Sequence, residues 1–167
     1  MPALAEPVNQ TFFNPLDVME QIASAHDWLF DRPNEQEMAV EICGHWCDYR
    51  VYVSWNDDLR ALQFACAYDT RVPEMQRARM NELLALINEK IGIGHFDISS
   101  RDGLPVFRHA IPMRGVPGAS VEQLEDLVDI ALSECDRFYP DFQLVVWGGR
   151  EPADAMAVSL LEPVGEA

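Results

Sequence analysis

Two hydrophobic periods alternate along the chain and divide it into elements. Apolar residues recur every three or four positions in segments that predict helices over 14–26, 73–91 and 120–138. Between these segments apolar and polar residues alternate, which is typical of strands with one buried face. These runs predict strands at about 28–30, 38–42, 49–55, 61–68, 95–99 and 105–111. The order helix, meander, helix, hairpin, helix predicts an α+β two-layer sandwich, in which an antiparallel sheet carries the helices on one face.

Residues that favour helix ends support these boundaries. Asn14 is a favoured N-cap and Pro15 a favoured first helical residue, so the first helix should begin there. Ser120 and Gln123 have the spacing of a capping box, which should open the third helix. The expected organisation is a flexible tail, a single domain and a second flexible tail, over 1–13, 14–161 and 162–167.

The segment 140–147 fits two periods. The spacing of Phe138, Phe142 and Val145 suits a kinked helix, whereas alternate apolar residues within the segment suit a strand. We favour the helix. A short last helix is expected over 152–161.

The net charge of the chain limits the classes of molecule that it could bind. The 167 residues include 12 basic and 28 acidic ones, for a net charge of −16. Such a chain should be repelled by nucleic acid and by anionic membrane surfaces, because both are bound through Lys and Arg. A membrane span is also not expected, since no apolar run approaches the roughly 20 residues required. No Lys or Arg precedes Arg32, so the basic start of a secretory signal is missing and we expect a cytoplasmic protein.

The sequence offers little catalytic or metal-binding chemistry. Cys43 and Cys47 flank His45, but a closed zinc site needs four ligands, so we expect reduced thiols and no bound metal. The four histidines are scattered, and none falls in a metalloprotease or hydrolase motif. We therefore expect no catalytic residues and no cofactor. One acidic stripe on the third predicted helix could bind a cation or a basic partner, although a solvated face is favoured: Glu122, Glu125, Asp126 and Asp129.

Aromatic residues are the remaining functional signal. Several lie in turns or on the nominally outward face of a strand, where aromatic side chains often mark contact surfaces. The resulting candidate surface for binding a protein consists of Trp46, Tyr52, Phe138, Phe142 and Trp147.

Several of these segments together resemble one family over about 14–161. They are Asn14-Pro15-Leu16-Asp17-Val18, Ala61 to Asp69, Leu83 to Asp97, Phe107-Arg108-His109-Ala110, and Phe138-Tyr139-Pro140 running on to Trp147. In these segments the chain is similar to the YbjN family of bacterial sensory transduction regulators. The resemblance implies a fold like that of the type III secretion chaperones, which are small, acidic, dimeric α+β proteins. It implies no catalytic residues.

Two classes of function follow. The first is a non-enzymatic protein-binding module, chaperone-like or regulatory, that forms a homodimer and binds an unidentified protein partner. The alternative is a small-molecule sensor or enzyme whose site is built from His95, Asp97 and His109. A large closed pocket lined by these groups would favour the alternative, whereas a grooved or flat apolar surface would favour the binding module.

Overall fold

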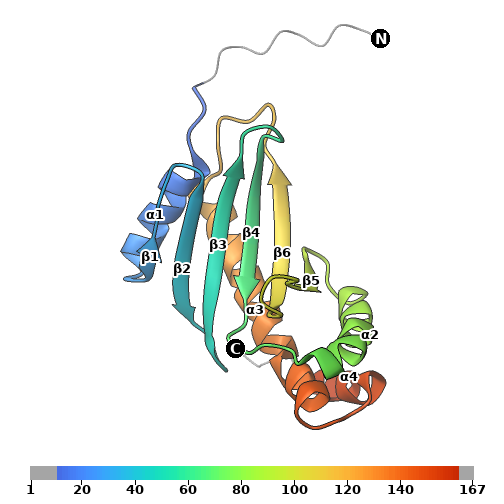
Figure 1. Ribbon diagram of the computed structural model, residues 1–167. Helices are drawn as coiled ribbons and strands as arrows, with labels where there is room; N and C mark the ends of the chain where they lie inside the picture. The colour runs from blue at the N-terminus through green and yellow to red at the C-terminus, as the bar shows by residue number, and fades with distance from the viewer. Residues whose placement is uncertain (1–10, 162–167) are drawn as a thin grey trace, which may run out of the picture.

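The computed structural model describes residues 11–161, so the expected tail at 162–167 and most of that at 1–13 lie outside the described residues. The described part consists of an antiparallel sheet and four α-helices (Figure 1). In chain order the elements are α1 (Pro15–Ala25), β1 (Leu29–Asp31), β2 (Glu37–Cys43), β3 (Asp48–Asn56), β4 (Ala61–Ala67), the 3-10 turn η1 (Glu74–Gln76), α2 (Arg77–Asn88), β5 (His95–Ile98), β6 (Pro105–Pro112), α3 (Val121–Val146) and α4 (Pro152–Leu161).

The strands form one open sheet with the order β1-β2-β3-β4-β6-β5, and every neighbouring pair is antiparallel. The predicted α+β class, the antiparallel sheet and the last helix are confirmed. Helices α1 and α3 lie behind the sheet in Figure 1, whereas the face toward the viewer carries no helix. We call the helix-covered side the inner face and the opposite side the outer face.

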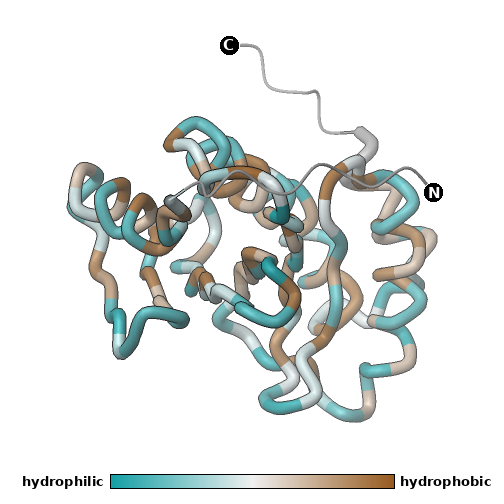
Figure 2. The backbone as a smooth tube through the Cα atoms, turned by 90° about the horizontal axis from the view of Figure 1, so that it is seen from above, coloured by the Kyte–Doolittle hydropathy of each residue, from teal (hydrophilic) through white to brown (hydrophobic). Residues whose placement is uncertain are grey.

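The strand period decides which residues reach the core. Along β3, Tyr49, Val51, Val53 and Trp55 point to the inner face and are buried, while Tyr52 between them is exposed. Figure 2 shows hydrophilic and hydrophobic residues interspersed along the backbone of the described chain. Full burial of a Val-sized side chain contributes roughly 1.5 to 3 kcal/mol, so a one-residue slip of a central strand would be costly.

Helix α2 differs in extent and position from the prediction. The segment 73–91 divides into η1 and α2, and Pro73 precedes the turn with an extended backbone instead of opening the helix. Helix α2 packs against α3, α4 and β5, so it lies at the β5 edge of the sheet (Figure 1). Its apolar residues thus close the end of the core.

Helix α3 continues through Pro140 without ending, so the predicted end at 138 is wrong and the strand alternative for 140–147 is excluded. A proline inside a helix removes the amide that would bond to the carbonyl four residues earlier. Here the carbonyl of Asp136 accepts instead from the indole Nε1–H of Trp46, at 3.1 Å. This replacement compensates for the lost helical bond.

Phe12 and Phe13, which belong to the segment expected to be a flexible tail, contact the rest of the described chain. The ring of Phe12 lies 4.7 Å from that of Trp55, and the guanidinium of Arg60 lies over Phe12 at 4.6 Å. The amide of Phe13 donates to the carbonyl of Pro117 at 2.7 Å. These contacts fix the approach to α1.

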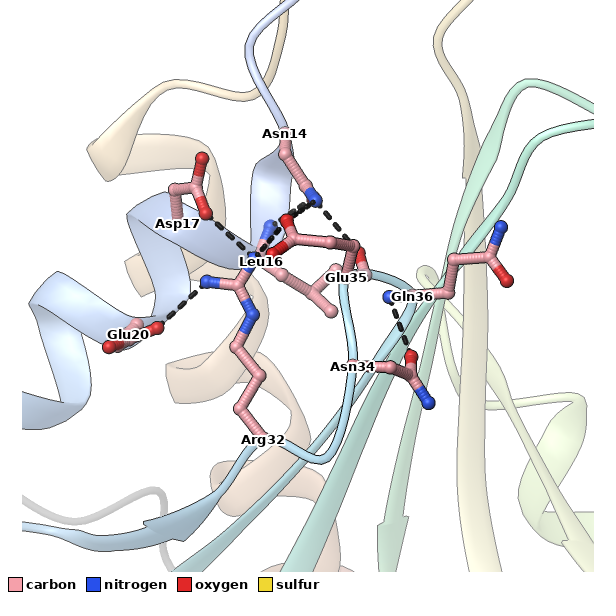
Figure 3. A network of polar contacts seen from close by, with 8 residues as sticks. All are labelled: Asn14, Leu16, Asp17, Glu20, Arg32, Asn34, Glu35 and Gln36. Atoms are coloured by element: carbon pink, nitrogen blue, oxygen red, sulfur yellow. Dashed lines mark hydrogen bonds and ion pairs between the residues drawn. The ribbon is translucent and has the colours of Figure 1, made fainter.

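The start of α1 is tied to the loop between β1 and β2 by Arg32 (Figure 3). Its guanidinium lies 2.7 Å from a carboxylate oxygen of Asp17, 2.7 Å from one of Glu20 and 3.1 Å from one of Glu35. The Arg32 side chain is only 13% exposed, so these ion pairs are screened less than pairs in open solvent. A single guanidinium therefore pairs with three carboxylates. Asn14 also caps α1 as predicted, since its side chain accepts from the amide of Leu16 at 3.0 Å.

Candidate functional site

The outer face of the sheet is not covered by any helix of the described chain. Because strand neighbours share a face in an antiparallel sheet, the register places one row of outward side chains across all the strands. From β1 to β5 this row is Asp31, Ala39, Tyr52, Ala65, Arg108 and His95. The row divides at Tyr52 into two halves of different chemistry.

The half formed by β1, β2 and β3 exposes apolar side chains beside Asp31, Glu41 and Arg50, and we call it the apolar half. Leu29 is 73% exposed and Tyr52 is 43% exposed; Phe30 is also exposed, but it pairs with the buried Val40 and so points to the inner side at the edge of the sheet. These residues line a hollow of about 360 Å³ together with Ala39. The Arg50–Glu41 ion pair, at 2.7 Å, lies in the same hollow and neutralises both charges.

The half formed by β4, β6 and β5 holds a second hollow of about 750 Å³, which we call the basic hollow. The turn at 99–104 closes one end of it, and this turn lies in front of the sheet in Figure 1. The residues that line it include polar and charged ones from four strands and the turn: Tyr52, Ser54, Gln63, His95, Ser99, Arg101, Asp102, Arg108 and His109.

The two carboxylates near the arginines of the basic hollow already have partners. Arg108 pairs with Asp97 only through Nε, at 3.4 Å, and both side chains are partly exposed. The carboxylate of Asp102 accepts from the amide of Leu104 at 3.2 Å. A hydrogen bond from Ser99 lowers the pKa of Asp102, so this charge is held within its own turn.

The two histidines of the alternative hypothesis lie on different faces of the sheet. Both residues line the basic hollow, but His109 pairs with the buried Phe64 and so points to the inner face, while His95 shares the outer row with Arg108. Partial burial, followed by the proximity of His95, lowers the pKa of His109, so His109 is neutral at pH 7. Asp97 does not complete a catalytic group with them, because it is engaged by Arg108. In the described part of the chain no hydrogen bond joins a histidine to a serine, threonine or cysteine side chain, so a nucleophile–base pair is not formed there.

The cysteine hairpin makes a structural contact with α3. The amide of His45 and the hydroxyl of Tyr49 both donate to Oδ1 of Asp136, at 3.1 and 2.7 Å. The ring of Trp46 stacks on Tyr139, with centroids 5.9 Å apart. The hairpin thus closes over the proline region of α3.

The thiols of this hairpin are poor metal ligands in this conformation. Burial, followed by the nearby Asp69, raises the pKa of Cys47 to about 12, and a hydrogen bond with Asp48 raises the pKa of Cys43. A metal binds the thiolate, which these shifts disfavour. Within residues 11–161 no three His, Cys, Asp or Glu side chains are grouped closely enough to hold one ion.

The predicted contact surface is only partly supported. Phe138 is 0% exposed and Phe142 is 4% exposed, so their assignment to a surface is wrong; they face inward from α3 and belong to the core. Trp46, Tyr52 and Trp147 are exposed, but they lie at the β2–β3 hairpin, on the outer face and at the end of α3, respectively. The structure does not bring these five residues into one surface.

Sequence reasoning did not identify Arg101, Arg108 or Asp136 as site residues. Arg101 and Arg108 approach each other only through strand pairing and the turn that precedes β6, which no local motif reveals. Asp136 had a local signal, because it lies four residues before Pro140 in a predicted helical region. The acidic stripe of α3 is exposed along its length, as a solvated face would be.

An open antiparallel sheet backed by helices, with a bare face and without a catalytic pair among the described groups, is consistent with a regulatory or binding module. The model of the YbjN family, described as "putative bacterial sensory transduction regulator", matches residues 15–144, and the chain therefore belongs to this family. This match confirms the resemblance stated from the sequence.

A solved structure supports the fold. The crystal structure of YbjN from E. coli, described as "a putative transcription regulator", matches with a TM-score of 0.51 and 16% identity. The match covers 74% of this chain and 88% of that one, and at this identity it shows the fold alone. No curated protein matches the chain. In the part that the structure describes, no helix is both long and apolar enough to cross a bilayer.

Proposed function

We propose that this protein is a non-enzymatic protein-binding module, chaperone-like or regulatory, whose first partner is a second copy of itself. The apolar half of the outer face carries the proposal. An antiparallel sheet can leave one face in water, but that face is then normally polar. Here Leu29 and Tyr52 expose apolar surface on the same face, as at a contact site.

The energetics allow such an association in spite of the charge. Two copies with a net charge of −16 repel each other, but at physiological salt this repulsion is screened beyond about 8 Å. The contact would be centred on the apolar half, where Arg50 and Glu41 neutralise each other and Asp31 adds one negative charge at the edge. Burial of apolar area contributes about 25 cal/mol per Å² before the entropy of association is subtracted. A two-fold arrangement would place the apolar half of both copies in the contact.

The chemistry of the site supports a role without catalysis. The basic hollow is open. Burial lowers the pKa of His109 and so favours its neutral form, while Asp97 is paired with Arg108, so these two groups do not form an acid–base pair. All four cysteines are free, which suits the reducing cytoplasm that we propose as its location. A small-molecule sensor is the second candidate, favoured by the volume and charge of the basic hollow.

Sedimentation velocity tests the proposal at about 10 µM protein and 0.15 M salt. We expect a dimer for the wild type and a monomer for Leu29→Glu and for Tyr52→Glu, since each substitution places a further negative charge in the apolar half of the outer face. Leu59→Glu is the matched control, because Leu59 is 65% exposed but lies in the turn between β3 and β4. A wild type that sediments as a single species of 18.9 kDa would contradict the self-association.

The same variants distinguish self-association from binding of another protein. A monomeric wild type whose capture of a cytoplasmic protein is abolished by Tyr52→Glu, and retained by Leu59→Glu, would preserve the binding module without the dimer. If neither dimer nor Tyr52-dependent capture is found, the apolar half of the outer face has no binding role.

A further inference from the structure

The basic hollow gathers two of the few arginines of an acidic chain. Acidic residues outnumber basic ones by 28 to 12, yet Arg101 and Arg108 both line the hollow, together with Asp102, and Asp97 lies against Arg108. In a chain with so few cations, two arginines at one hollow are a distinct arrangement.

The donors of these residues are available to a ligand. The only polar contact of the Arg108 guanidinium is that of Nε with Asp97 at 3.4 Å, so its two terminal nitrogens have no partner among the described residues. Arg101 makes no ion pair or hydrogen bond in the described chain either. The Asp102 carboxylate does not occupy them, since Ser99 and the amide of Leu104 hold it in the turn.

The rest of the hollow has the shape and polarity of a small-molecule site. Its volume of about 750 Å³ lies within the usual range for ligand pockets, which is roughly 300 to 1,000 Å³. Ala65 and Leu104 supply apolar surface beside the arginines, and Tyr52 supplies an aromatic ring at the border with the apolar half. A guanidinium pairs with carboxylate or phosphate oxygens through two parallel hydrogen bonds.

We propose that the basic hollow binds a small organic anion. The carboxylate or phosphate group of the anion pairs with the terminal nitrogens of Arg108 and with Arg101, and its apolar body lies on Ala65, Leu104 and the Tyr52 ring. This site goes beyond the protein contact proposed above, because it uses the strands on the other side of Tyr52. It gives the module a chemical signal to which it could respond.

The test is a titration of ¹⁵N-labelled protein with three probes, observed by NMR. The probes are phenyl phosphate, benzoate and the neutral benzyl alcohol. We expect saturable shifts in the amides of 99–110 with at least one of the two anions, and binding at least about tenfold weaker for benzyl alcohol. The stronger of the two anions identifies phosphate or carboxylate as the preferred group.

Two substitutions should change the affinity in opposite directions. Arg108→Gln removes the guanidinium that pairs with the anion and should weaken anion binding about tenfold. Asp97→Asn removes the carboxylate that competes for Arg108 and should strengthen anion binding. Arg114→Gln is the matched control, since Arg114 is an exposed arginine in the loop after β6 and should leave the affinity unchanged. The spectra themselves show whether each variant is folded.

The proposal is overturned if no probe gives saturable shifts at about 10 mM, a concentration at which even a weak specific site would fill. It is also overturned if benzyl alcohol binds as tightly as the anions, or if Arg108→Gln binds them as tightly as the wild type. Equal weakening by Arg108→Gln and Arg114→Gln would show a general charge effect and would likewise contradict a site.

Discussion

The indole of Trp46 donates to the carbonyl of Asp136, at 3.1 Å, and so takes the place of an amide that Pro140 does not have. In an α-helix the carbonyl of residue 136 accepts from the amide of residue 140. Because proline lacks this amide, α3 should be weakest at this point. The β2–β3 hairpin supplies the donor and also stacks Trp46 on Tyr139, so the sheet supports the helix where its own bonding fails.

Replacement of Trp46 by Phe should reduce the free energy of unfolding by about 1 kcal/mol, because a ring remains to stack but the indole donor is lost. The same replacement in a Pro140→Ala background should cost less, since the new amide at 140 can satisfy the carbonyl of Asp136. Urea unfolding of the wild type, both single variants and the double variant measures the coupling. Equal costs of Trp46→Phe in the two backgrounds would show that the hydrogen bond and the proline are independent.

Asn88 should stabilise the short strand β5 through its side chain. Its Nδ2 donates to the carbonyl of Phe96 at 3.1 Å, and its Oδ1 accepts from the amide of Phe96 at 2.7 Å. Asn88→Ala leaves both backbone groups unpaired in a partly buried place, so we expect a loss of about 2 kcal/mol. Thermal unfolding measures the loss, and hydrogen exchange at the Phe96 amide should accelerate. Asn81→Ala, on an exposed position of the same helix, should change neither quantity appreciably.

Asp27 occupies a backbone conformation that suits glycine better. Its φ is 56°, and it follows α1 in a turn where the amide of Trp28 donates to the carbonyl of Ala23 at 2.9 Å. Asp27→Gly should raise the free energy of unfolding by about 0.5 kcal/mol, because relief of the left-handed strain exceeds the added entropy of the unfolded chain. Asp27→Ala is the control: it also removes the negative charge at the helix end but keeps the Cβ. If Asp27→Ala stabilises as much as Asp27→Gly in urea unfolding, charge and not strain is the cause.

The sequence predicted the elements of this fold because their signals are local. The alternation along β3, the Asn14 cap and the Ser120–Gln123 capping box each act within a few residues, and all three are present in the structure. The end placed at 138 failed for the opposite reason. Pro140 lies inside α3, and the carbonyl that it leaves without a helical amide accepts from Trp46, which is distant in sequence.

The candidate site could be predicted less well, because it depends on strand order. The chain passes from β4 through α2 and β5 before β6 inserts next to β4, and only this crossover brings Arg108 beside Ala65. Spacing along the chain contains no such information. Phe138 and Phe142 show a second limit: aromatic residues near a proline could lie on either side of the helix, and packing places them inside.

The thiol of Cys47 should react slowly at neutral pH and increasingly fast as the pH rises. Burial and Asp69 raise its pKa to about 12, so the reactive thiolate fraction increases about tenfold per pH unit between pH 7 and pH 10. At pH 8 that fraction is about a thousandfold lower than for a free cysteine, whose pKa is about 8.5. Iodoacetamide labelling of folded protein, with the modified site located by peptide mass spectrometry, measures the rate.

The unfolded protein provides the control for this experiment, because in about 6 M urea Cys47 should regain the reactivity of an ordinary thiol. Asp69→Asn should increase the labelling rate of the folded protein, since it removes the second cause of the raised pKa. A labelling rate of Cys47 that levels off near pH 9 in the folded protein would mean that the thiol is solvated. The β2–β3 hairpin would then be open at Cys47, and burial would not be the reason for slow labelling.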